Sequence, residues 1–323
     1  MSLLRLRLGM VGTLAFIIAV STLFFAAILS LMGGLNLIAL TSFVILFNIG
    51  QWLVAPYLID SLYSTRSVSR SESPKLWEMV ETVSRRVGLE TPKLMLANIS
   101  LPNAFAYGSP ITGNKVALTT GLLKELEDEE VEAVVGHELG HLKHKDMQVM
   151  MLASVLPAIF YQLGYSMMLS SAYGRGERRE GSGGLATLIG IGSLVLYWIL
   201  TLFVLGLSRM REYYADRTSA SSVEDGARKL SEGIAKIVAS TGRIKSRPVS
   251  LGTSNSFKAL FISDPDSAAR DELAIAQSRM FKADQRLVEE IVSRRVTAFD
   301  RVLELLSTHP NIVKRLQALR KLA

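Results

Sequence analysis

The sequence predicts a membrane protein in which four transmembrane α-helices are joined to an α+β, mostly helical part outside the bilayer. Hydrophobic residues make up 49% of the 323 residues, and the mean hydropathy is +0.29, which is too apolar for an ordinary soluble domain of this length. Three long stretches contain no Asp, Glu, Lys or Arg: residues 8–59, 147–174 and 181–208. A helix needs about 20 apolar residues to cross a bilayer, so the first stretch is long enough for two spans and the others for one each.

The first stretch predicts an uncleaved hairpin of two spans. Its turn is expected between Gly33 and Asn36, because glycine and asparagine favour turns. A cleaved signal peptide is the rival interpretation, since Arg5 and Arg7 resemble a charged n-region. The apolar core exceeds the roughly 7–15 residues of such peptides, and a second span follows at once, so two retained anchors are expected.

The two later stretches predict a second membrane hairpin. Each can cross the bilayer, and the loop between them holds Arg175, Arg178 and Arg179. A pair of buried core helices is the alternative, which Pro157 and Gln162 make possible. The chain then divides into a two-span hairpin at 8–59, a first soluble part at 60–146, a second hairpin at 147–208 and a second, helical soluble part at 209–323.

Charge predicts the orientation and excludes some functions. The formal net charge is +7 without a large block of Lys or Arg, so nucleic acid is not expected as a partner, whereas an anionic lipid bilayer is. Because cytoplasmic loops carry an excess of Lys and Arg, the N-terminus and both soluble parts are placed in the cytoplasm. This orientation puts the following residues inside: Arg5, Arg7, Arg66, Arg70, Lys75, Lys143, Lys145, Arg209, Arg211 and Arg217. The absence of cysteine excludes disulfides, thiolate zinc sites and cysteine nucleophiles.

The soluble parts show α+β patterning. Apolar residues recur at helical spacing in 71–87, and a mostly helical chain is expected after residue 208. The elements predicted between them are a strand at 92–99, a hairpin of 103–109 with 115–120 around Thr112-Gly113-Asn114, and a helix from Leu122 or Asp128 to Lys145.

The predicted chemistry lies in the last of these helices, in the motif His137-Glu138-Leu139-Gly140-His141. Residues four apart lie on one helical face, so both imidazoles can bind one Zn²⁺ while Glu138 lies beside it. The metal lowers the pKa of a water molecule toward about 7, and Glu138 can take its proton during attack on a peptide carbonyl. Such a motif also arises by chance, but here three of the four histidines fall within eight residues of a strongly helical segment. One zinc ion per chain, with Glu138 as the catalytic base, is therefore expected.

Two residues compete for the place of the third zinc ligand. His144 lies on roughly the same face as the other histidines, but three ligands from one straight helix close poorly around a tetrahedral ion, so an interfacial polar role is preferred for it. Glu212 follows the second membrane hairpin, which returns the chain to the membrane face that carries His141. A glutamate from elsewhere is the usual alternative, and Asp216, one turn further on, can orient a zinc-bound imidazole. An exposed, charged helix start is the other interpretation of this segment.

The sequence resembles the HtpX-type heat-shock membrane proteases, in the metallopeptidase family that also holds the CAAX prenyl proteases. The residues that carry the resemblance are the His137 to His141 motif, Glu212 with Asp216, Asn103-Ala104-Phe105, and Ser307-Thr308-His309-Pro310. The order of spans and motifs matches as well, so the resemblance covers nearly the whole chain. Residues 264–302 depart from it by being longer and more charged, and no role is predicted for them.

The resemblance implies membrane anchors joined to a zincin-like metallopeptidase domain, with zinc bound by His137, His141 and Glu212 and with Glu138 catalytic. It implies a multi-pass enzyme of a prokaryotic cell membrane whose catalytic domain faces the cytoplasm. The implied reaction is hydrolysis of internal peptide bonds in misfolded or damaged membrane proteins, as part of a stress response. The substrates are thus proteins, while the oligomeric state is not predicted.

Two further roles gain support from the resemblance. The segment that begins at Asn103 is expected to be an edge strand to which a substrate adds as an extra strand; an ordinary hairpin is the equal alternative. His309 is expected to approach the zinc and stabilise the oxyanion; a helix-end residue held by Pro310 is the equal alternative.

Two other functions compete with this one. The first is a CAAX-type prenyl-protein processing peptidase. The family resemblance implies that such an enzyme needs a large chamber enclosed in the membrane, and four spans are too few to build one. A non-catalytic membrane chaperone with structural zinc would need no general base, and structural sites are usually closed by four protein ligands. The presence of Glu138 therefore favours the peptidase.

Overall fold

The computed structural model describes residues 37–173, 182–245 and 284–323. The predicted first span of 8–59 with its turn, the loop at 175–180 and the start of 264–302 lie outside the described residues. The chain divides into two compact units. The first comprises residues 53–147 and 208–323, and the second contains the described residues up to 52 and residues 148–207.

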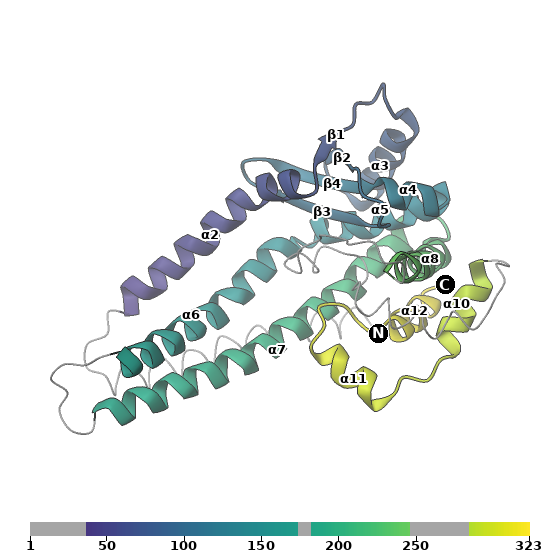
Figure 1. The fold of residues 1–323 in the computed structure, drawn as a ribbon. Helices are drawn as coiled ribbons and strands as arrows, with labels where there is room; N and C mark the ends of the chain where they lie inside the picture. Colours follow the sequence, from purple (N-terminus) through teal and green to yellow (C-terminus); the bar gives the residue numbers. More distant parts are fainter. Residues whose placement is uncertain (1–36, 174–181, 246–283) are drawn as a thin grey trace. The chain divides into compact units, whose positions relative to one another are not determined.

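The described chain is mostly helical and contains one small sheet (Figure 1). Its elements in order are α2 (Leu37–Leu62), β1 (Thr65–Ser67), α3 (Pro74–Val87), β2 (Lys93–Ala97), β3 (Ala104–Ser109), β4 (Gly113–Thr119), α4 (Thr120–Glu125), α5 (Asp128–Lys143), α6 (Asp146–Tyr173), α7 (Ser182–Ser222), α8 (Gly226–Lys245), α10 (Asp284–Ser293), α11 (Ala298–Leu305) and α12 (Ile312–Arg320). The helix, strand and hairpin predicted before the motif are confirmed as α3, β2 and the pair β3–β4.

The sheet of the first unit has the strand order β1-β2-β4-β3. β2 pairs with β4 in parallel, and the other two pairs are antiparallel. The turn of the β3–β4 hairpin uses Gly113 at φ +71°, a left-handed conformation that glycine adopts without strain. The predicted turn at Thr112 to Asn114 is therefore correct, and β3 is an edge strand of the described sheet.

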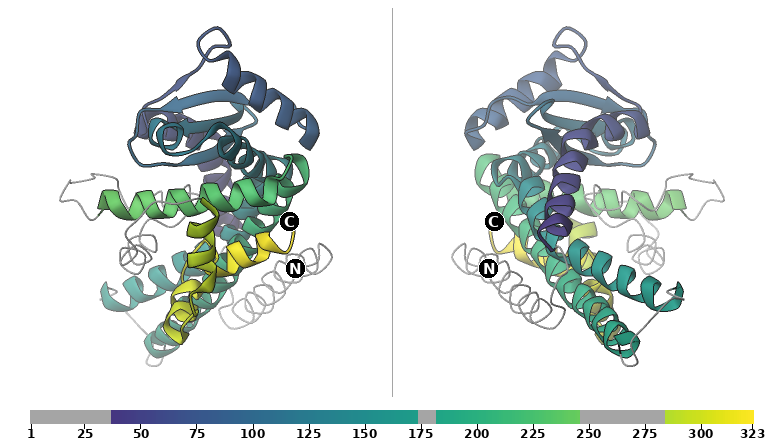
Figure 2. Two further views of the ribbon diagram at one scale, coloured as in Figure 1. Left: turned by 90° about the vertical axis from the view of Figure 1, so that its right-hand side faces the viewer. Right: turned by 90° about the vertical axis from the view of Figure 1, so that its left-hand side faces the viewer.

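Alternating residues of the strands build two different apolar layers. Leu94 and Val116 point into a core that contains residues of α3 and α5. Met95 and Phe105 point to the other face, where Ile59 near the end of α2 and Tyr63 just after it complete the layer. α5 lies between the sheet and α8 (Figure 2), so the helix with the histidine motif is at the centre of this unit.

The motif helix begins at the later of its two predicted starts. A separate short helix, α4, ends before Leu126, and α5 then starts with a capping box formed by Glu127 and Glu130. Acidic residues in the first turn of α5 suit the positive end of the helix dipole. α5 ends at Lys143, two residues before the predicted end, because Lys145 adopts a positive φ of 53°.

Two of the described helices are long and apolar enough to cross a membrane, namely Asp146–Met168 within α6 and Ala186–Ser222 within α7. Large apolar side chains on them, such as Leu152, Leu188 and Trp198, are exposed. This exposure favours lipid contact over the alternative of buried core helices. The described residues thus contain two candidate spans, while four spans stay a prediction.

Candidate metal centre

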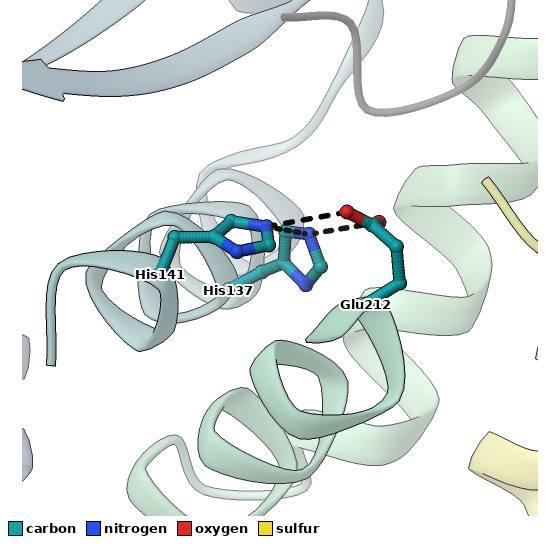
Figure 3. Close-up of side chains that lie close together, drawn as sticks. All are labelled: His137, His141 and Glu212. Carbon is teal, nitrogen blue, oxygen red and sulfur yellow. Dashed lines mark hydrogen bonds and ion pairs between the residues drawn. The ribbon is translucent and has the colours of Figure 1, made fainter. Parts of the chain in front are cut away.

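Helices α5 and α7 bring three potential metal ligands together in the first unit. His137 and His141 lie on one face of α5, and Glu212 reaches them from α7 (Figure 3). The two Nε2 atoms are 3.2 Å apart, and Glu212 lies 3.6 Å from the Nε2 of His137 and 3.5 Å from that of His141. One ligand atom from each residue lies within 4.8 Å of the others.

Small residues allow α5 and α7 to approach closely enough for this geometry. A Cβ atom on Gly140 would lie 2.9 Å from the Cα of Ala215, closer than such atoms come in proteins. One turn earlier, Gly136 also faces Ser219, where a Cβ atom would lie 3.3 Å from the Cα of Ser219, and the hydroxyl of Ser219 donates to the carbonyl of Ala133 at 2.6 Å. The glycine inside the histidine motif is therefore required by the helix contact that delivers Glu212.

Asp216 contacts the ring nitrogen of His137 that points away from Glu212. Its Oδ1 lies 3.0 Å from Nδ1 of His137, and both side chains are buried. Burial and the nearby charge of Arg315 lower the pKa of His137, which favours the neutral imidazole. Only the neutral form can bind a metal ion.

His141 has a corresponding partner that sequence reasoning missed. Asp146, the first residue of α6, lies 2.5 Å from Nδ1 of His141 and is buried. Arg211 of α7 balances its charge, with 3.1 Å between Nε and the carboxylate. Burial lowers the pKa of His141, but the bond to Asp146 and the negative charges of Asp146, Glu212 and Glu138 together outweigh burial, so the net shift is upward. The available signal was an acidic residue five positions after His141, immediately before an uncharged stretch.

Glu138 is buried beneath the edge strand of the sheet. Its carboxylate makes a hydrogen bond with the backbone of Ala106, in the middle of β3, and lies close enough to His141 and Glu212 to feel their charges. Burial is the largest effect and raises the pKa of Glu138 to about 7. A carboxyl group so placed is suited to exchange protons near neutral pH.

The last helix supplies a buried arginine that the sequence analysis did not single out. Arg315 forms a bidentate pair with Asp216, at 2.9 Å from Nε and 2.7 Å from Nη2, and its Nη1 lies 3.2 Å from Glu212. Burial opposes its charge, but Asp216 and Glu212 outweigh burial and raise the pKa of Arg315. Its position among the buried residues Ile312 and Leu316 was the signal, because an arginine on the apolar face of a helix needs a partner.

The remaining predicted residues divide between the site and its surroundings. His309 lies beside Glu212, at 3.3 Å between Nδ1 and Oε2, and is buried. His144 instead contacts the hydroxyl of Thr218 at 3.1 Å and the ring of Tyr214, so it takes no part in the ligand group. Asn103 is buried just before the edge strand β3, and its backbone N–H donates to Thr119.

The side chains of this centre fit a catalytic zinc ion. Two imidazole nitrogens and one carboxylate oxygen form the donor set of zinc sites that keep a further place open. Each imidazole is also held by a carboxylate on its other nitrogen, as zinc-binding histidines usually are. Such bonds set the tautomer and the ring orientation, so the ligands are arranged before the ion arrives.

Comparisons with known proteins identify the family of the chain. Residues 70–323 match the model of peptidase family M48. The Thermoplasma acidophilum protein named "Protease HtpX homolog" is 35% identical, with 100% of this chain and 99% of that one covered. "Protease HtpX homolog 2" of Sulfurisphaera tokodaii is also 35% identical, with 98% of this chain and 97% of that one covered.

A solved structure shares the fold. The crystal structure of S. mikatae Ste24p matches with a TM-score of 0.54 over 97% of this chain, at 16% identity, and this chain covers 65% of that one. This likeness concerns the fold alone, because the identity is low. The family match and the relatives that align over the full chain support an assignment to a family: this chain belongs to peptidase family M48 and is an HtpX-type protease.

Proposed function

We propose that the chain is a membrane-bound zinc endopeptidase that hydrolyses internal peptide bonds of misfolded or damaged membrane proteins. One observation carries the proposal: Glu138 shares a buried site with His137, His141 and Glu212. A structural zinc site is closed by four protein ligands, whereas three ligands beside a free carboxylate suit hydrolysis. The candidate spans in α6 and α7 support substrates at the membrane.

The side chains around the site have separate roles in hydrolysis. His137, His141 and Glu212 would hold a zinc ion, which would supply Lewis-acid chemistry to the peptide carbonyl and to water when bound. Glu138 takes the proton from the attacking water and passes it to the leaving nitrogen. His309 donates toward the carbonyl oxygen as charge develops on it; its position next to Glu212 supports this role.

The edge strand gives the substrate a place to bind. The middle of β3 is joined to Glu138 through the backbone of Ala106. A substrate segment that pairs with β3 as an additional strand would carry its peptide bonds past Glu138. Main-chain pairing selects extended, unfolded segments rather than particular side chains, which is consistent with damaged proteins as substrates.

The test uses the purified full-length chain, an unfolded membrane protein as substrate, and zinc analysis of every variant. Glu138→Ala should keep its zinc and lose about 10²–10⁴ in rate, because general base catalysis is lost but no ligand is. Glu212→Gln should lose zinc, whereas His144→Ala should keep it. The assignment is wrong if Glu138→Ala retains near-normal activity, or if His144→Ala loses zinc while Glu212→Gln holds a full equivalent.

A further inference from the structure

Helix α11 presents apolar side chains to the outside of the first unit. None of its residues is buried. Phe299 is 67% exposed, and Val302, Leu305 and Leu306 at its end are 56%, 54% and 59% exposed. The spacing of these residues places them on one side of the helix, while Asp300 lies on the other. A gathered apolar surface of this kind usually marks a place of interaction.

Both ends of α11 are nevertheless well held. Thr297 and Asp300 form a capping box at its start. At its end the guanidinium of Arg209 donates to the carbonyls of Glu304 and Ser307 at 2.8 and 2.7 Å. The side chain of Glu304 in turn accepts from the backbone N–H of Asn311, at the start of α12. The exposed face therefore belongs to a fixed helix, not to a frayed end.

The position of Arg209 along α7 relates the end of α11 to the membrane surface. Arg209 is the first charged residue after the uncharged stretch 181–208, and residues 182–209 belong to the continuous helix α7. A basic residue at this position is where an apolar span leaves the bilayer and meets the headgroups. Because Arg209 binds the last carbonyls of α11, the C-terminal end of α11 lies at the same level.

The charges around α11 suit a lipid surface. Arg301 is exposed on the helix itself, and Arg295 is exposed three residues before it begins. Basic residues beside an apolar helix face are attracted to anionic headgroups. A short helix with exposed Phe, Val and Leu, flanked by arginines and tied to the end of a span, matches the requirements of an interfacial helix.

We propose that α11 lies in the membrane interface, with Phe299, Val302, Leu305 and Leu306 in contact with lipid. The occupant of this face is the bilayer surface, rather than a second protein. The residues that follow α11 lead directly to His309, beside Glu212. Lipid contact thus holds the start of the segment that delivers His309 to the site. The position of α11 is independent of the proposed hydrolysis and can be measured without any substrate.

The absence of cysteine makes the test direct, because one introduced thiol carries the only label. A spin label on Phe299→Cys is measured in the full chain, reconstituted in vesicles of equimolar phosphatidylglycerol and phosphatidylcholine. The expected result is strong relaxation by oxygen and weak relaxation by a water-soluble nickel chelate, at a depth of about 5–10 Å below the headgroups. A label on Glu289→Cys, exposed on α10, is the matched control and should favour the nickel chelate.

Two other results would overturn the proposal. A label at position 299 that favours the nickel chelate places α11 in water. A label that neither reagent reaches places it beneath protein, either another part of this chain or a second copy. Adding Val302→Asp to Phe299→Cys should raise nickel relaxation several-fold if lipid covers the face. Unchanged zinc content of each variant shows that the site is folded, so failure here is separate from failure of the proposed protease activity.

Discussion

At the residue scale, the candidate centre consists of histidines that are each held by a carboxylate. Asp216 contacts His137, and Asp146 contacts His141. These bonds fix which ring nitrogen faces Glu212 and therefore decide whether the three donors converge. The two carboxylates have basic partners of their own, Arg315 and Arg211, so buried negative charge does not accumulate.

The first prediction concerns Arg315. Arg315→Ala should lower the free energy of unfolding by about 3–5 kcal/mol, because it leaves the buried Asp216 without its bidentate partner. Chemical denaturation of the detergent-solubilised chain measures the loss. Arg320→Ala, an exposed position on the same helix, is the control and should change stability by less than about 0.5 kcal/mol. Equal losses in the two variants would mean that the pair with Asp216 contributes little.

At the element scale, two contacts position the site. The first is the close contact of α5 with α7 through Gly136 and Gly140, which brings Glu212 to the histidines. The second joins the end of α2 to the sheet: Asp60 accepts hydrogen bonds from Thr65 at 2.6 Å and Tyr107 at 2.5 Å. Tyr107 belongs to β3, so this second contact holds the edge strand that covers Glu138.

The helix contact gives the second prediction. Gly140→Ala should cost about 1–3 kcal/mol, because its methyl group meets the Cα of Ala215 and forces the helices apart. Since Glu212 would move with α7, the zinc affinity should fall although no ligand is changed. Zinc titration measures this. Gly184→Ala, where a Cβ meets nothing within 4 Å, should leave zinc affinity unchanged. Tight zinc binding by Gly140→Ala would show that the contact does not position Glu212.

The third prediction is that the contribution of Asp60 to stability depends on pH. Burial raises the pKa of this carboxyl, but bonds from Lys115, Thr65 and Tyr107 outweigh burial and lower it below its usual value of 3.8. The folded state therefore favours the carboxylate. Its contribution to stability is fully present above that usual value and is lost as pH falls through the lower folded pKa.

Hydrogen exchange of the β3 and β4 amides measures this contribution. In the natural chain, protection of these amides should fall as the medium is acidified to about pH 3. Asp60→Asn should have lower protection at neutral pH and a flatter acid response. Glu90→Gln removes an exposed carboxylate and should leave the response unchanged. An acid response of Asp60→Asn equal to that of the natural chain would contradict the prediction.

At the scale of the whole molecule, the interrupted organisation of the chain is the main feature. Two separate parts of the chain, within 53–147 and 208–323, together supply the site, and the apolar stretches of α6 and α7 stand between them in the sequence. α7 runs without a break from Ser182 to Ser222, so the same helix contains a candidate span and Glu212. We infer that an outward and a return span bring both parts to one membrane face.

This inference gives a topological prediction. Both termini and residues 60–146 should face the cytoplasm, because the basic residues gather there. Tags in each segment, tested for protease access in sealed and oriented vesicles, measure the orientation. The loop Arg175–Glu180 should be protected when the cytoplasmic side is exposed. Cleavage of that loop from the cytoplasmic side would leave α6 and α7 as re-entrant or peripheral helices.

The sequence by itself determined the local features of this protein. Uncharged length predicted α6 and the apolar part of α7, strand and turn signals predicted β2, β3 and β4 but not β1, and the spacing of His137 and His141 predicted one helical face. These properties depend on neighbours within a few residues, and neighbours in sequence are neighbours in space within a helix or strand. Glu212 and Asp216 were also named correctly as neighbours of the histidines, because the return of a membrane hairpin restricts where the chain can go.

Only the tertiary structure decided which distant side chains surround the histidines. Arg315 lies 178 residues after His137, yet its guanidinium contacts His137, Asp216 and Glu212. Nothing in the local pattern assigns that contact, because it depends on how α12 packs against the rest of the first unit. The roles of Asp146 and of Gly140 were hidden for the same reason. A carboxylate becomes the partner of a histidine only when tertiary packing brings the two side chains together. In the same way, a glycine becomes a helix contact only when packing places a second helix against it.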